Sequence, residues 1–314
     1  MINILLFSTM IFFCCLNQAS AGAWTQPAGT LYAKAYLGSL SSPRYWDLQG
    51  NSISVLKEEI MPGDRLFQYY SNGRNYTLDF SAIMSGLYAE YGVTDKLTAI
   101  VDMPFGYFSL TETYETDRDT ESPTYLRKPE RNALSLATFT YYGFGGRYLL
   151  HGNKSVVSLS AGVRIPPGTT NGIFADTVQM PFLSDGGLQE WFGLEVGMPF
   201  SDGWFEGEMK YTGRHEELQD ELTFHAEYGH KSIEEIMIKL SIDITQGLGS
   251  RNNLPNFDTR RTILVEDFGA VTIGVIIQAS DKTFVEGSYQ VRLFGNNSWA
   301  LNGAFGGFGI KTSL

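Results

Sequence analysis

Apolar and polar residues alternate along most of this 314-residue chain. From 97 to 105 every odd position is apolar, whereas the even positions include Thr98 and Asp102. A period of two is typical of a β-sheet whose two faces meet different surroundings. In a soluble sandwich the apolar face packs on a second sheet, whereas in a membrane barrel it contacts lipid and the polar face lines the interior. The pattern therefore predicts an all-β fold of one of these two kinds.

Charged residues on the second face distinguish the two folds. In residues 203–214, Phe205 and Met209 lie on one face and Glu206 and Lys210 on the other. Segments 219–229 and 233–246 repeat this arrangement. A Lys or Arg facing mid-membrane lipid costs about 2–4 kcal/mol, so these charges belong inside a barrel. The sequence predicts a transmembrane antiparallel up-and-down β-barrel, with the soluble sandwich as the alternative.

Segments of this kind can be assigned along the whole chain, and they predict about 12 strands, or 10 to 14 if the first long loop contains a hairpin. The intervening segments alternate between short and long, as in barrels with short periplasmic turns and long extracellular loops. The expected strands cover residues 30–41, 77–91, 95–112, 135–149, 155–166, 187–199, 203–215, 219–229, 233–246, 262–279, 282–293 and 299–313.

The first residues have the pattern of a secretory signal peptide. An apolar stretch ends near Cys15, and small residues follow that would permit cleavage after Ala21 or Ala23. The stretch has about fourteen apolar residues, which is short for a membrane anchor of roughly 20. We therefore expect residues 1–21, extending to 23 in the alternative, to be a cleaved signal, and residues 22–314 to form an outer-membrane barrel. Both cysteines lie in the signal, so the mature chain would have neither a disulfide nor a thiolate site.

Several classes of function are disfavoured by composition. The formal net charge of −11 leaves no basic stripe for nucleic acid, so no nucleic-acid partner is expected. The acidic turns lack the ligand spacing of a calcium loop, so no metal or cofactor is expected.

Four stretches carry a family resemblance: "AWTQPAG", "YAEYGVTDKLTAIVDMPF", "GFGGRYLLHGNKSVVSLSAGVRIPPG" and "FEGEMKYTGRHEELQDELTFHAEYG". They resemble the bacterial outer-membrane family of phenol-degradation meta-pathway proteins, which is grouped with barrels of the long-chain fatty acid transporter type. The resemblance implies an outer-membrane channel or transporter for small hydrophobic or aromatic molecules, with no catalytic residue. The implied partners are outer-membrane lipids, the barrel-assembly machinery and small apolar solutes.

A lumen of twelve strands would be wider than that of an eight-stranded barrel and narrower than that of a sixteen-stranded porin. The inward positions would be charged. These side chains could line a conducting route, or they could pair with one another and close the lumen. The candidate lining residues are Lys34, Glu90, Arg147, Arg164, Glu195, Glu206, Glu208, Lys210, Arg214, His225, Glu227, Glu235, Lys239, Asp243, Glu286 and Arg292.

Two other functions are open from the sequence. Residues 71–74, Ser-Asn-Gly-Arg, are similar to a motif of outer-membrane phospholipase A, but Tyr69 stands where that family has its base histidine. Without a base the hydroxyl of Ser71 is not activated, and His225 is the only histidine expected to face the lumen. A lipid-modifying enzyme is therefore the weaker hypothesis. The other is a non-conducting structural or surface-interaction barrel.

Overall fold

The structure is a computed structural model, and it describes most of the chain after the expected signal. The described residues are 22–42, 44–46, 50, 52–53, 56–57, 75–116, 128–152, 154–167, 187–214, 220–233, 235–248, 267–296 and 298–313. The expected signal peptide at 1–21 lies outside them, as do Ser71 and most of the two longest loops.

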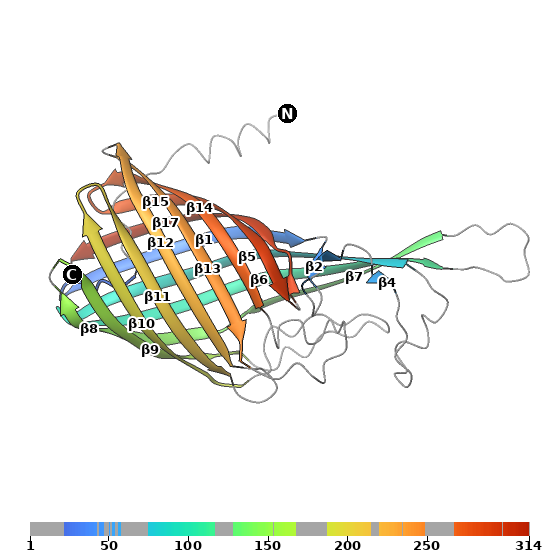
Figure 1. The fold of residues 1–314 in the computed structure, drawn as a ribbon, viewed down its shortest axis with the longest axis horizontal. Coiled ribbons are helices and arrows are strands. Elements are labelled where there is room, and N and C mark those ends of the chain that lie inside the picture. Colours follow the sequence, from blue (N-terminus) through green and yellow to red (C-terminus); the bar gives the residue numbers. More distant parts are fainter. Residues whose placement is uncertain are drawn as a thin grey trace, which may run out of the picture.

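The described residues form a closed antiparallel β-barrel of twelve strands with one additional strand (Figure 1). Apart from β7 and β8, which both pair with β6, consecutive strands of the barrel pair with one another, as in an up-and-down barrel. The strands are β1 (Thr30–Ser42), β5 (Asn75–Thr94), β6 (Leu97–Thr116), β7 (Lys128–Phe139), β8 (Tyr142–Gly152), β9 (Val156–Ile165), β10 (Gln189–Phe200), β11 (Gly203–Arg214), β12 (Glu221–Ile233), β13 (Ile236–Gly247), β14 (Asp267–Ser280), β15 (Thr283–Asn296) and β17 (Asn302–Ser313).

The barrel closes between the first strand and the last. Strand β1 pairs with β5 on one side and with β17 on the other, so that Leu31 lies opposite both Tyr91 and Thr312. Within the described ranges, no strand of the closed ring has a free edge along its full length, and a free edge is where another strand could pair wrongly.

One expected strand is divided. The sequence predicts a single strand at 135–149, but β7 and β8 follow one another along β6 and pair with its outer and inner halves, respectively. The division falls opposite Pro104, which has no N–H to donate to the ladder. There the backbone N–H of Thr140 donates to the carbonyl oxygen of Pro104 at 2.9 Å.

The connections differ in length at the two ends of the barrel. The turn end carries the short connections 95–96, 153–155, 201–202, 234–235 and 281–282, together with the start of β1 and the end of β17. The loop end carries the longer ones, and there the short strands β2 (Tyr45–Trp46), β3 (Ser52–Ile53) and β16 (Ser298–Trp299) form a small sheet. β4 (Leu56–Lys57) pairs with β5, while "RLFQYY", the other half of the possible hairpin, lies outside the described residues.

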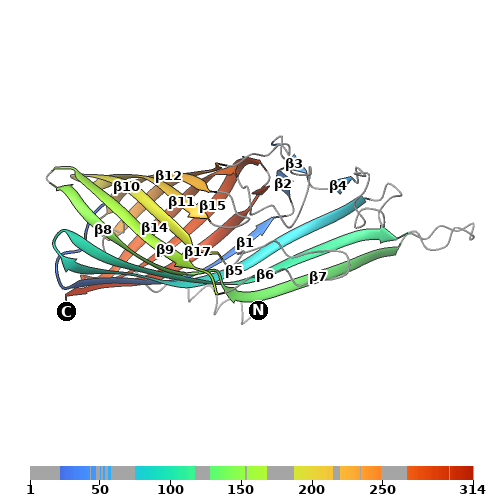
Figure 2. The ribbon, with the colours of Figure 1, turned by 90° about the horizontal axis from the view of Figure 1, so that it is seen from below.

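Strands β5, β6 and β7 extend past the other strands at the loop end (Figure 2). Strand β6 continues to Thr116 beyond its pairing with β8, and β7 accompanies it. Among the residues that the structure describes, β7 has no partner strand besides β6.

The two faces of the barrel wall have opposite chemistry. Large apolar side chains such as Leu37 (59% exposed) and Phe192 (61% exposed) point outward, whereas Glu90, Arg147 and other polar residues are buried inside. This inside-out arrangement is that of a barrel surrounded by lipid. No helix in the described part of the chain is long and apolar enough to cross a membrane.

An apolar cluster fills part of the interior at the turn end. It consists of Tyr32, Met237, Ile276 and Phe284, which come from β1, β13, β14 and β15. The rings of Tyr32 and Phe284 are stacked, with centroids 5.5 Å apart. This side of the barrel is therefore closed by packing.

Candidate functional site

The remaining part of the turn end is filled by the residues that precede β1. We call residues 22–29 the N-terminal plug. Ala23 and Gln26 are 0% and 1% exposed, which shows that the plug lies inside the barrel. Ser158 Oγ donates to the carbonyl oxygen of Ala23 at 2.6 Å, and the backbone N–H of Gln26 donates to Thr98 Oγ1 at 2.8 Å. The plug is thus fixed to the walls formed by β6 and β9.

Its last residues are held by the turn between β5 and β6. The backbone N–H of Ala28 donates to Asp95 Oδ1 at 3.1 Å, and that of Gly29 donates to the carbonyl oxygen of Gly92 at 2.8 Å. The C-terminal end of the plug therefore lies at the rim of the barrel, and its first residues lie further inside.

Arg147 is the centre of the polar network above the plug. Its Nη1 lies 2.8 Å from Glu90 Oε1 and its Nε lies 2.5 Å from Glu195 Oε2. Gln26 Nε2 donates to the other oxygen of Glu90 at 2.7 Å, and Tyr88 donates its hydroxyl proton to Glu90 Oε1 at 2.6 Å. Charges taken out of water are stable only when they are paired and hydrogen-bonded, and this network meets that condition on strands β5, β8 and β10.

A second network lies on the opposite wall. Lys34 forms an ion pair with Glu286, and Lys239 lies 3.3 Å from Glu227 and 3.7 Å from Glu286. Strands β1, β12, β13 and β15 contribute to it, directly beside the apolar cluster. Together the two networks and the plug close the turn end of the described barrel.

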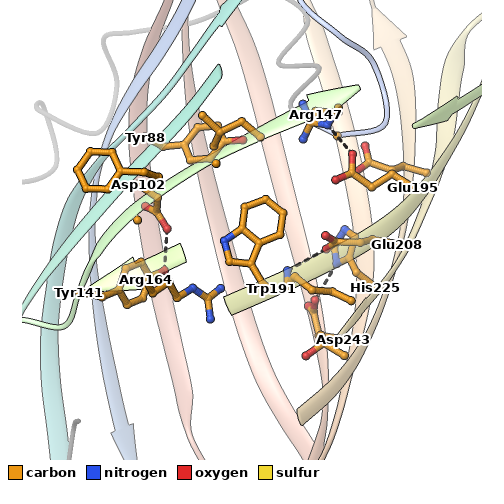
Figure 3. A pocket seen from close by; sticks show the side chains of 18 residues that line it. Tyr88, Asp102, Tyr141, Arg147, Arg164, Trp191, Glu195, Glu208, His225 and Asp243 are labelled. Atoms are coloured by element: carbon orange, nitrogen blue, oxygen red, sulfur yellow. Dashed lines mark hydrogen bonds and ion pairs between the residues drawn. The ribbon is translucent and has the colours of Figure 1, made fainter. Parts of the chain in front are cut away.

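Above this closure lies a cavity of about 380 Å³ (Figure 3). Its floor includes Gly22 of the plug and Arg147, and aromatic side chains from three strands or connections face it. Its walls also carry paired charges: Lys210 with Glu208 at 3.0 Å, and His225 with Asp243 at 2.7 Å. The lining also includes Tyr88, Asp102, Tyr141, Arg164, Trp191 and Glu206.

Trp191, on β10, lies across the wall of the cavity. Its ring packs over strands β8 and β9, which have glycines at the positions that face it. A Cβ atom on Gly145 would be 2.5 Å from the indole, and one on Gly162 would be 2.7 Å from it. The two glycines therefore provide the space in which the ring lies flat against the sheet. Close by, the guanidinium of Arg164 is 4.8 Å from the centre of the Tyr141 ring, and the Tyr141 hydroxyl donates to Asp102 Oδ2 at 2.7 Å.

The structure places most of the expected lining residues on the inner face. The two networks contain Lys34, Glu90, Arg147, Glu195, Glu227, Lys239 and Glu286, and the cavity contains Arg164, Glu206, Glu208, Lys210, His225 and Asp243. Arg214 and Arg292 lie nearer the loop end, where Arg214 pairs with Glu221 at 2.7 Å and Arg292 lies 3.7 Å from the centre of the Phe268 ring.

Glu235 is placed differently from the expectation. It lies in the exposed turn between β12 and β13, because β13 begins only at Ile236. Sequence reasoning also missed the aromatic lining and Asp102, and it missed the plug altogether. Asp102 could have been predicted to face inward, because it lies an even number of residues from Thr98 on the same strand.

The structure adds little to the enzyme hypothesis. Ser71 lies outside the described residues, and His225 is paired with Asp243. Within the described ranges, no three His, Cys, Asp or Glu side chains come together as metal ligands would.

Comparison with known proteins places the fold. No protein-family model and no curated protein matches the chain. Among solved structures, the COG4313 outer membrane channel from Pseudomonas putida F1 is similar at a TM-score of 0.59 and 8% identity, over 95% of this chain and 100% of that one. The Ralstonia pickettii toluene transporter TbuX has a TM-score of 0.43 and 7% identity over 92% and 90%, and the P. putida toluene transporter TodX has 0.40 and 9% over 91% and 90%.

The similarity to the P. putida F1 channel extends over 95% of this chain and all of that one, so the two share a fold. The chain is thus a β-barrel of the kind found in outer-membrane channels. The finer resemblance to phenol-degradation proteins has no support from family models.

Proposed function

We propose that this protein is a channel of the bacterial outer membrane, with the turn end in the periplasm, that takes up small hydrophobic or aromatic molecules. One observation supports this most strongly: a lipid-type exterior surrounds a cavity whose floor includes Gly22 of the plug. A wall-to-wall packed interior would have no such cavity. The fold shared with a P. putida F1 channel supports the same proposal.

Among such molecules, the cavity favours aromatic compounds that carry a polar group. A volume of about 380 Å³ suits a small molecule. Trp191 and Tyr141 offer ring faces, while Arg164 and Asp102 offer a donor and an acceptor beside them. A wholly apolar solute would displace water from these charged groups without replacing its hydrogen bonds, which is costly. Phenol is therefore expected to enter more readily than toluene.

The test is single-channel conductance of the refolded mature barrel in planar bilayers, with phenol, toluene and glucose added in turn. We expect phenol to shorten the open times at concentrations where glucose has no effect. Trp191→Leu should weaken this block about tenfold, because stacking on one aromatic ring is worth roughly 1–3 kcal/mol. Tyr107→Leu removes an aromatic side chain from the outer face of β6 and should leave the block unchanged.

The second candidate is a barrel that does not conduct. It is favoured by the apolar cluster and the ion-pair networks, which fill the turn end together with the plug. A variant lacking residues 22–28 separates the two functions. If folded barrels of this variant remain electrically silent and fail to admit any of the three solutes into liposomes, the channel proposal is wrong.

A further inference from the structure

Among the described residues, Glu206 is the one carboxylate in the cavity floor that has neither a hydrogen bond nor an ion pair. It lies on β11, points inward and is 7% exposed. The other charged groups around it are already engaged: Glu195 with Arg147, Glu208 with Lys210, and Glu227 with Lys239. Its register partner on β12 is Glu227, a second carboxylate. A buried carboxyl group beside a like charge is stable when it is protonated or when a cation lies next to it.

The nearest part of the plug is Gly22. The carboxylate of Glu206 occupies the place where a Cβ atom on Gly22 would lie. The backbone nitrogen of any residue is about 2.5 Å from its Cβ position. Because Glu206 Oε2 overlaps that position on Gly22, the nitrogen of Gly22 and this oxygen are at most about 4.2 Å apart. This upper bound is close to the limit of an ion pair.

In an unprocessed chain this nitrogen is a neutral amide, but the sequence predicts signal cleavage after Ala21 or Ala23. We propose that cleavage occurs after Ala21 and that the new α-ammonium group of Gly22 is the counter-ion of Glu206. Signal peptidase hydrolyses the bond between Ala21 and Gly22 with one water molecule. Ala21 leaves as a carboxylate with the signal, and the nitrogen of Gly22 becomes –NH₃⁺. Processing thereby supplies a positive charge beside Glu206.

The plug itself distinguishes the two cleavage sites. Gly22 and Ala23 are both buried, and the carbonyl oxygen of Ala23 accepts the bond from Ser158. Cleavage after Ala23 would remove both residues, leave Ser158 without this acceptor and place the new amine at Trp24, away from Glu206. Cleavage after Ala21 retains the whole buried segment.

The first measurement needs no variant. The mature protein is isolated from outer membranes, its intact mass is determined, and its amines are acylated in the folded and the urea-unfolded state. We expect a chain that begins at Gly22, whose α-amine is acylated at least about tenfold more slowly when folded, which corresponds to about 1.4 kcal/mol. A chain that begins at Trp24, or an α-amine that reacts equally in both states, overturns the inference. Neither result would bear on whether the barrel conducts.

Two variants then test the partner. Glu206→Gln keeps the shape of the side chain and removes its charge, so the α-amine of the folded protein should react about tenfold faster than in the wild type. Glu208→Gln is the matched control, since it lies two residues away on the same strand and pairs with Lys210. Heat-modifiable migration on gels shows whether each variant is folded. If both variants react like the wild type, Glu206 is not the counter-ion. If Glu206→Gln does not fold, Glu206→Ala, which also removes the charge, is labelled in its place, and the same increase is expected.

Discussion

Gln26 donates a hydrogen bond from its side-chain nitrogen to Glu90 at 2.7 Å, which joins the N-terminal plug to strand β5 across 64 residues of sequence. The acceptor is a fully buried carboxyl group that also pairs with Arg147. Hydrogen bonds of this kind contribute about 1.5–3 kcal/mol, so this contact contributes substantially to holding the plug in the barrel.

The first prediction follows from that contact. Gln26→Ala should raise the population of displaced plug about tenfold to a hundredfold, because a hydrogen bond to a charged group is lost. The measurement is the frequency of open events in single-channel records, with limited proteolysis near residue 26 as a second readout. Pro27→Ala is the control, since Pro27 is exposed. Equal opening in both variants would show that the plug is held elsewhere.

The second prediction concerns Arg147. Arg147→Met leaves Glu90 and Glu195 buried without their cation, and removal of one partner from a buried pair costs about 3–5 kcal/mol. The urea midpoint of unfolding, followed by heat-modifiable migration, should fall accordingly. A triple variant that adds Glu90→Gln and Glu195→Gln should recover much of the loss. If the single variant is as stable as the wild type, the network contributes nothing to stability.

The third prediction concerns the space beside Trp191. A Cβ atom on Gly162 would lie 2.7 Å from the indole and would also contact the carbonyl oxygen of Phe144, so Gly162→Ala should displace the ring into the cavity and strain the pairing of β8 with β9. We expect a shift in tryptophan fluorescence and a smaller conductance. Gly287→Ala is the control, because a Cβ atom there would meet nothing within 4 Å. Identical spectra for both variants would contradict the placement of the ring.

The fourth prediction tests the outer face. Leu87 and Val93 both point outward from β5, the first in the middle of the strand and the second beside the turn. An arginine at mid-membrane costs about 2–4 kcal/mol, whereas one near the interface costs about 0–1 kcal/mol. Leu87→Arg should therefore reduce the folding free energy in lipid vesicles far more than Val93→Arg. Equal costs would contradict the assignment of this face to lipid.

The sequence allowed the barrel wall to be predicted closely because each strand carries its own signal. Alternation identifies a strand and both of its faces without knowledge of its neighbours, so Glu206, Lys210 and Asp243 were expected on the inner side and are found there. The wrong placement of Glu235 has the same origin. Glu235 lies an even number of residues from Lys239, so alternation predicts that it faces inward. Alternation alone does not show that the strand begins only at Ile236.

The contents of the barrel could not be predicted in this way. Residues 22–29 show no alternation. No local sequence pattern distinguishes a segment that folds into the lumen from one that stays outside the barrel. The plug is defined by long-range bonds, such as that between Ala23 and Ser158, whose partners are 135 residues apart. The place of Trp191 likewise depends on glycines from two other strands, which become its neighbours only when the sheet has formed.

The seam between β1 and β17 joins Thr30 to Ser313, so the two ends of the barrel chain are neighbours in space. Contacts between such distant residues form late, because the entropy of closing the intervening chain must first be overcome. The ring therefore cannot be completed while the protein is still being synthesised. Until the last strand arrives, β1 and β15 each present an unpaired edge, and this interval is when the chain is most exposed to pairing with a wrong neighbour.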